Sequence, residues 1–136
     1  MPMRILPLLL IIFSARIQAI EFPLEVIEFI DNARVVAFID EADIDKASYW
    51  EPFEGAPPLS LADALNAVHE HLAADPDFGN ATLAGIELKQ IPHHENCWHY
   101  LVKIQTRSDA KQRSHYFIVL MSGKVISGLR EPETVK

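Results

Sequence analysis

The clearest helical pattern lies in the centre of the chain, where apolar residues recur at intervals of three or four positions. They are Leu61, Leu65, Val68 and Leu72. This spacing places them on one face of a helix. Ser60 can accept a hydrogen bond from a free N–H of the first turn, and Asp63 places a negative charge near the helix N-terminus. Asp75-Pro76 ends the pattern, so we predict one helix between Ser60 and Asp75.

The last third of the chain has the shorter periods typical of β-strands. The strand-length runs are Leu83–Ile91, Trp98–Thr106 and His115–Met121, with a short further run at Lys124–Ile126. In the middle run apolar side chains from Trp98 to Ile104 share one face, and His99 lies on the other. The connections 92–97 and 107–114 are short enough for antiparallel hairpins.

The pattern is weaker ahead of the helix. Residues 20–32 follow no single period and are expected to form a short strand or a loose arm, whereas Ala33–Ile39 is rich in β-branched and aromatic residues. These elements predict an α+β fold, with one main helix packed on an antiparallel β-meander of three to four strands and one extra N-terminal strand. The helix would cover one sheet face and leave the other free for function. The charged tail from Arg130 is expected to fray.

Residues 1–19 have the pattern of a signal peptide. Arg4 gives a positive start, Ile5–Phe13 is an unbroken apolar run, and Ala19 is the small residue that a signal peptidase needs. The apolar run is shorter than the ~20 residues that span a bilayer. We therefore expect a secreted or periplasmic protein, with residues 20–136 as a single domain and no membrane span after cleavage. An uncleaved leader would act as a weak membrane tether.

Charge and cysteine content narrow the function. Loss of Arg4 and Arg16 with the leader changes the formal net charge from −7 to −9. An acidic surface repels phosphate backbones and anionic lipids, so nucleic acid is not an expected partner. Cys97 is the single cysteine, so no intrachain disulfide can form and the fold depends on its apolar core.

One cluster of metal-ligating residue types stands out on the predicted hairpin before Trp98. Its members are His93, His94, Cys97 and His99. Imidazole and thiolate are ligands for zinc or copper, and Cys97 and His99 would lie on the same strand face. The alternative is a polar hairpin tip of accidental composition, with Cys97 half-buried beside Trp98.

A second candidate surface lies in the irregular segment 40–58. Its aromatic residues Tyr49, Trp50 and Phe53 could contact a partner, or they could pack onto the body of the domain. No phosphate-binding loop, nucleophile elbow or H-E-x-x-H motif is present in the sequence. We therefore expect no enzymatic activity and, apart from the possible zinc or copper site, no cofactor.

The predicted helix is followed by three short motifs, Ile86-Glu87-Leu88, Tyr100-Leu101-Val102, and Tyr116-Phe117-Ile118-Val119 leading to Gly123-Lys124-Val125. With these motifs, residues 60–127 resemble the PepSY-type module of secreted bacterial proteins. Met121-Ser122 departs from the acidic or Asn-Gly-like turn that usually precedes the final glycine of those modules. A cystatin-like sheet wrapped on a helix describes the pattern equally well, although the inhibitory loop motifs of cystatins are not present. The resemblance implies a non-catalytic module that restrains a protease or holds a ligand.

The sequence as a whole therefore favours a small secreted or periplasmic binding module with a protein or peptide partner in the envelope. A metal-binding envelope protein that uses the histidine and cysteine hairpin is the alternative.

Overall fold

A computed structural model describes residues 24–30, 32–45 and 49–131 of the chain. The elements follow in the order β1 (Leu24–Ile30), β2 (Ala33–Ile39), α1 (Glu41–Asp45), α2 (Leu61–Ala73), the 3₁₀ helix η1 (Pro76–Phe78), β3 (Thr82–Gln90), β4 (Trp98–Ser108), β5 (Lys111–Leu120), β6 (Val125–Ser127) and β7 (Leu129–Arg130). The predicted leader, residues 1–19, lies outside the described residues.

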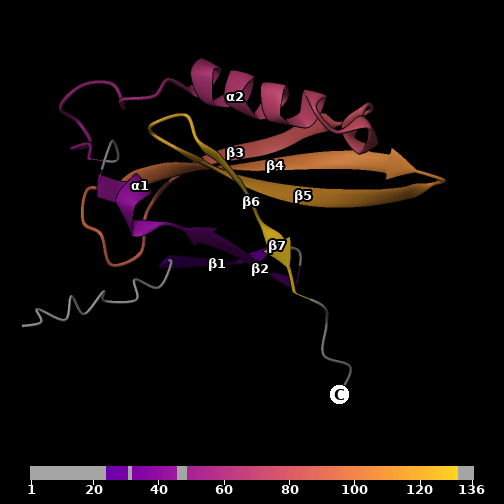
Figure 1. The fold of residues 1–136 in the computed structure, drawn as a ribbon, viewed down its shortest axis with the longest axis horizontal. Coiled ribbons are helices and arrows are strands. Elements are labelled where there is room, and N and C mark those ends of the chain that lie inside the picture. The colour runs from indigo at the N-terminus through magenta and orange to yellow at the C-terminus, as the bar shows by residue number, and fades with distance from the viewer. Residues whose placement is uncertain (1–23, 31, 46–48, 132–136) are drawn as a thin grey trace, which may run out of the picture.

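The strands form two antiparallel sheets, one with the order β1-β2-β7 and the other with the order β3-β4-β5-β6. Figure 1 shows three layers, with α2 on one face of the four-stranded sheet and the three-stranded sheet on the other. Alternation along each strand divides the core between these layers. On β5, for example, Phe117 and Val119 pack with α2, whereas Ile118 and Leu120 pack with the second sheet.

The predicted α+β fold class is wrong. The described residues are mostly β, and the N-terminal strand does not simply extend a meander. Ala33–Ile39 is a strand, as predicted, but it pairs with β1 along seven residues and with β7 at Val35 and Val36. The sheet face expected to be free is therefore covered by a second sheet. A helix on a single sheet would have left the other face of that sheet exposed to water, and β1, β2 and β7 bury it.

Both chain ends contribute to that second layer. Residues 24–30, expected as an arm or a short strand, form β1. Arg130, expected to fray, belongs to β7, and the next residue, Glu131, forms an ion pair with Arg34 at 2.6 Å. The chain passes from β6 to β7 through Gly128, whose N–H donates to the Tyr116 carbonyl oxygen at 2.7 Å. A Cβ at this glycine would lie 2.8 Å from Cγ1 of Val35.

The predicted helix is confirmed as α2. The N–H of Asp63 donates to the Ser60 hydroxyl oxygen at 3.1 Å, as a helix N-cap requires. Ala64 and Val68 are the buried residues of its inner face. The Tyr100 hydroxyl donates to the Leu59 carbonyl oxygen at 2.6 Å and so holds the segment before the helix against the sheet. Among the described helices, none is long and apolar enough to cross a membrane.

Candidate functional site

The predicted metal ligands lie in two different environments. His93 is exposed in the loop between β3 and β4 and has a positive φ of 63°. The Nδ1–H of His94 donates to the Pro92 carbonyl oxygen at 3.0 Å within the same loop. Cys97 is half-buried and packs against the core between the two sheets. The loop therefore leaves His93 exposed and His94 half-buried, while the strand that follows turns inward.

His99 is completely buried between the sheets. Its Nδ1–H donates to the Tyr100 carbonyl oxygen at 3.2 Å, and its Nε2 has no hydrogen-bond partner among the described residues. Burial lowers the pKa of His99, because desolvation disfavours the imidazolium. Cys97 and His99 do share the inter-sheet face, as their i, i+2 spacing predicts.

His115, the histidine of the neighbouring strand, lies on the opposite face of the four-stranded sheet, against Phe78. No group of three or more His, Cys, Asp or Glu side chains within the described ranges is arranged to hold a metal ion. The zinc or copper site stays a prediction that this geometry does not support.

The three predicted contact aromatics differ in role. Trp50 packs edge-to-face on Trp98, with ring centroids 5.5 Å apart, and its Nε1–H donates to the Gly55 carbonyl oxygen at 3.2 Å. It anchors the segment to the domain. Tyr49 and Phe53 are exposed, and the Tyr49 hydroxyl donates to a carboxylate oxygen of Glu51. That hydrogen bond raises the pKa of Tyr49, because the neighbouring carboxylate stabilises the protonated phenol.

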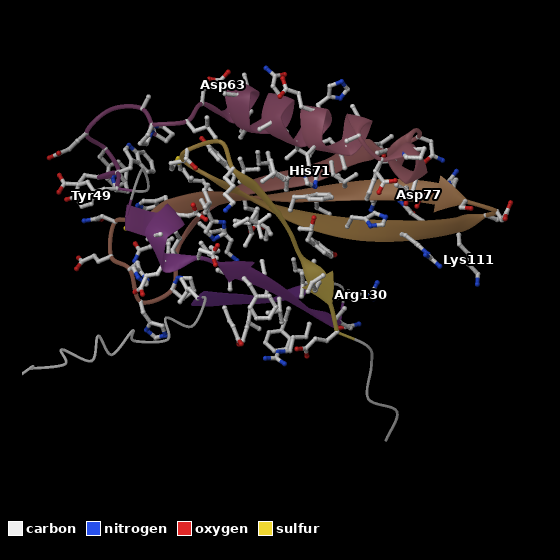
Figure 2. All side chains as sticks on the ribbon, in the orientation of Figure 1. Tyr49, Asp63, His71, Asp77, Lys111 and Arg130 are labelled. Atoms are coloured by element: carbon white, nitrogen blue, oxygen red, sulfur yellow. The ribbon has the colours of Figure 1, made fainter. Side chains whose placement is uncertain are left out.

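A larger concave site among the described residues lies elsewhere, in a groove at the end of the molecule that holds the tip of the β4–β5 hairpin. Figure 2 shows Asp77 and Lys111 at this end. The groove has a volume of about 730 Å³ and lies between η1 and the hairpin. Its lining comprises Asp75, Asp77, Phe78, Thr106, Ser108, Asp109, Lys111, Arg113 and His115. We refer to it as the hairpin groove.

The hairpin extends further than the sequence predicts. Residues 107–114 were expected as a connection, but the strands continue through Ser108 and from Lys111, so that only Asp109 and Ala110 form the turn. Both turn residues have positive φ angles, 47° and 64°, which match the twist of a two-residue hairpin. Pairing of Arg107 with Gln112 and of Ser108 with Lys111 completes the ladder.

The η1 side of the hairpin groove carries only acidic charges, Asp75 and Asp77, whereas the hairpin side carries the cations Lys111 and Arg113 together with Asp109 at the turn. On the η1 side, the Asp75 carboxylate accepts a hydrogen bond from the backbone N–H of Asp77 at 3.0 Å, and Asp77 is exposed. On the hairpin side, Lys111 and Arg113 are two residues apart on β5 and are exposed. Within the described residues neither of these cations forms an ion pair.

The floor of the hairpin groove is formed by side chains that contact one another. Phe78 packs edge-to-face on His115 at 4.8 Å between ring centroids and on Phe117 at 5.9 Å. His115 Nε2 lies 2.9 Å from the Thr106 hydroxyl oxygen. Burial, and then the positive charge of Arg113, lower the pKa of His115. A hydroxyl next to an imidazole resembles part of a nucleophile–base pair, but no carboxylate among the described residues orients this ring. The arrangement is suited to binding.

The groove was missed because its residues look like a polar loop in the sequence. A signal was present in the alternation of Thr106, Ser108, Lys111, Arg113 and His115, which places these side chains on one face of a two-stranded ribbon. The η1 side reaches the hairpin because the chain reverses direction after α2. Nothing in the sequence around η1 indicates that it lies next to the hairpin.

No family model, no curated protein and no solved structure matches this chain. The function therefore has to be argued from its own residues.

Proposed function

We propose that this protein is a small secreted or periplasmic binding module without catalytic chemistry, and that its partner is a protein or peptide segment held in the hairpin groove. The observation that carries the proposal is the pair of opposed charged sides, with Asp77 on η1 and Lys111 and Arg113 on β5, none of them in an ion pair among the described residues.

The chemistry of the groove favours a peptide over a small molecule. Small-molecule pockets enclose most of their ligand and are mainly apolar, whereas most of the groove's lining residues are polar and exposed. A peptide can place a carboxylate beside Lys111 and Arg113 and a cationic side chain beside Asp77. Phe78 offers an apolar contact, and the hydroxyl of Ser108 can bond to the peptide backbone.

The location and the module type rest on the sequence. The leader pattern of residues 1–19 supports export, and the PepSY-type resemblance of residues 60–127 supports a ligand-holding module. A peptide partner in the envelope is consistent with both.

A peptide array tests the proposal. The folded domain from residue 20 is applied to immobilised peptides that combine Glu, Lys and aromatic residues, and the binders are measured in solution by fluorescence anisotropy. Lys111→Ala/Arg113→Ala should weaken binding about tenfold or more, and binding should fall as salt increases.

Arg107→Ala is the matched control, because Arg107 carries the same charge on the same hairpin and does not line the groove. Peptides that bind the double variant and the wild type equally, or no binding at all, would refute the hairpin groove as the site.

A further inference from the structure

The four-stranded sheet has one long open edge. β3 is its terminal strand, and among the described residues it pairs only with β4. The helix α2 packs mainly on β4, β5 and β6, so part of β3 is uncovered on the helix side. Leu83 is 50% exposed and Leu88 is 36% exposed on that face. A long edge strand with exposed apolar residues can pair with another strand unless it is protected.

The usual protections are present only at the two ends of β3. The ladder with β4 shifts register between Leu83 and Gly85, and a bulge of this kind discourages further pairing. Pro92, just after the strand, cannot donate a backbone hydrogen bond. Lys89 would be a third protection, but its Nζ lies 2.6 Å from Glu28 of β1 and 3.9 Å from Glu87 of its own strand, so it already lies among carboxylates and can accommodate another one on an incoming strand. The stretch Ile86–Gln90 is therefore open and regular.

We infer that two copies of this chain associate through β3, antiparallel and about a two-fold axis, with Leu88 opposite Leu88 of the second copy. The register follows from charge. Glu87 and Lys89 flank Leu88 on the opposite face of the strand, so this register places Glu87 of each copy beside Lys89 of the other.

The neighbouring registers of the β3–β3 pair are less favourable. An axis at Glu87 or at Lys89 would place two like charges directly opposite each other. An axis at Ile86 would carry the pairing into the irregular part of the strand before Gly85. The side chain of Glu87 is 67% exposed and lies 3.9 Å from Lys89 of its own chain, so it remains accessible to a second lysine.

The surroundings of β3 leave room for the second copy. On the side toward β1 lies an open cleft of about 520 Å³, lined in part by Phe29, Glu87 and Lys89. The dimer would join two four-stranded sheets into one continuous sheet with both α2 helices on the same side. The hairpin groove is not part of this interface, so the inference does not depend on the proposed function.

Sedimentation of the leader-free protein over about 1 to 500 µM tests the inference, since a short edge-to-edge interface should give a Kd in the micromolar range. The wild type should dimerise reversibly. Glu87→Lys should weaken the dimer about tenfold or more, because two lysines then face each other at both ends of the pairing.

The complementary variant is Lys89→Glu, combined with Glu28→Gln so that the new carboxylate faces no other carboxylate across the sheets. This variant too should weaken the dimer about tenfold or more. Mixing the two variants should restore a dimer, because the lysine introduced into the first variant then faces the glutamate introduced into the second. At the other end of the pairing, the native Lys89 of the first variant faces the native Glu87 of the second. Circular dichroism of each variant checks that it is folded.

A cross-link tests the two-fold position directly. In a Cys97→Ser background, Leu88→Cys should form a disulfide-linked dimer with oxidised glutathione, because the axis brings the two thiols together. Leu83→Cys, on the same face of the same strand but away from the axis, is the matched control and should not. A monomeric wild type at the highest concentration overturns the inference. So does a dimer that persists in both charge variants, a mixture that does not reassociate, or equal cross-linking at the two positions.

Discussion

The two faces of the four-stranded sheet are covered by layers of different origin. One face packs on α2, a single local segment that the sequence reveals through its own periodicity. The other face packs on β1, β2 and β7, which come from opposite ends of the chain and meet through pairs such as Val36 with Leu129. The difference shows that a layer formed by one segment can be predicted from the sequence of that segment. A layer formed by distant segments depends on which strands pair, and the local sequence does not indicate this.

The two cores also differ in how deeply they bury a histidine, because His99 between the sheets is completely buried whereas His115 on the helix side is only partly buried. Each buries one side-chain nitrogen without a hydrogen-bond partner among the described residues, Trp98 Nε1 on the helix side and His99 Nε2 between the sheets. Only the imidazole can gain a proton in the physiological range. Acid should therefore destabilise the inter-sheet core.

The strongest test of the comparison is to remove core side chains from adjacent positions that face opposite layers. Ile118→Ala should lower the free energy of unfolding by about 3 kcal/mol, because Ile118 is buried beneath the second sheet. Val119→Ala, beneath α2, should cost about 2 kcal/mol, since fewer atoms are removed. Urea unfolding measures both. A loss below about 1 kcal/mol for Ile118→Ala would mean that the second sheet does not cover this face.

A second test concerns the passage between the two sheets. Gly128→Ala should destabilise the fold by about 2 kcal/mol, because the new methyl group would meet Val35 and the backbone of Tyr116. Gly85→Ala is the control: no atom lies within 4 Å of its added Cβ, so thermal unfolding should change little. Equal melting temperatures for the two variants would contradict the close approach of β2 at Gly128.

The helix layer has its own, smaller test. Ser60→Ala removes the hydroxyl that accepts the Asp63 N–H and should lower the stability by about 1 kcal/mol. Ser127→Ala, on an exposed position of β6, should have almost no effect in the same urea titration. If the two serines behave alike, the N-cap does not stabilise α2.

The smallest effect at neutral pH, and the one most specific to the inter-sheet core, is the titration of His99. Its pKa is lowered in the folded protein, so the unfolded chain binds the extra proton first, at its own pKa of about 6.5. Stability should therefore decrease as the pH falls below about 6.5 and continue to decrease until the folded protein is also protonated.

Urea titrations between about pH 7.5 and 5.5 should show a weaker pH dependence for His99→Leu than for the wild type. Some dependence should remain, because the pKa of His115 is lowered in the same direction. His69→Gln, at an exposed position of α2, is the control. An unchanged pH dependence in His99→Leu would show that this imidazole is not held neutral by the fold.

Local patterns account for what was predicted correctly. The Ser60 cap, the helix α2, the β-branched strand Ala33–Ile39 and the alternation along Trp98–Thr106 are all set by residues close together in the chain. The apolar stripe predicted for α2 was only partly correct, because Val68 is buried but Leu61 is 51% exposed. The hairpin was predicted too short because polar residues at 107–114 read as a loop. Strand pairing in that segment forms the backbone hydrogen bonds without needing an apolar face. The sequence of the segment therefore has no hydrophobic periodicity that would indicate a strand.

The candidate sites likewise combine features that the local sequence predicts with features that depend on the tertiary fold. The spacing of Cys97 and His99 correctly predicted that both lie on one strand face. It did not predict what covers that face. Since a second sheet buries His99 while His93 and His94 remain in the loop, residues adjacent in sequence are separated in space. The hairpin groove combines η1 and β5, whose residues Asp77 and Arg113 are far apart in the chain.

The sequence by itself determined the identity of most elements, the cap and end of α2, and the alternation that gives each strand two faces. These features depend on neighbours within a few residues, where propensity and periodicity act. Only the tertiary structure decided that β1, β2 and β7 form a second sheet, that His99 is buried, that the hairpin groove exists, and that β3 has an open edge. Such outcomes depend on which distant strands pair, because backbone hydrogen bonding is the same for every candidate partner and only packing of the whole chain selects among them.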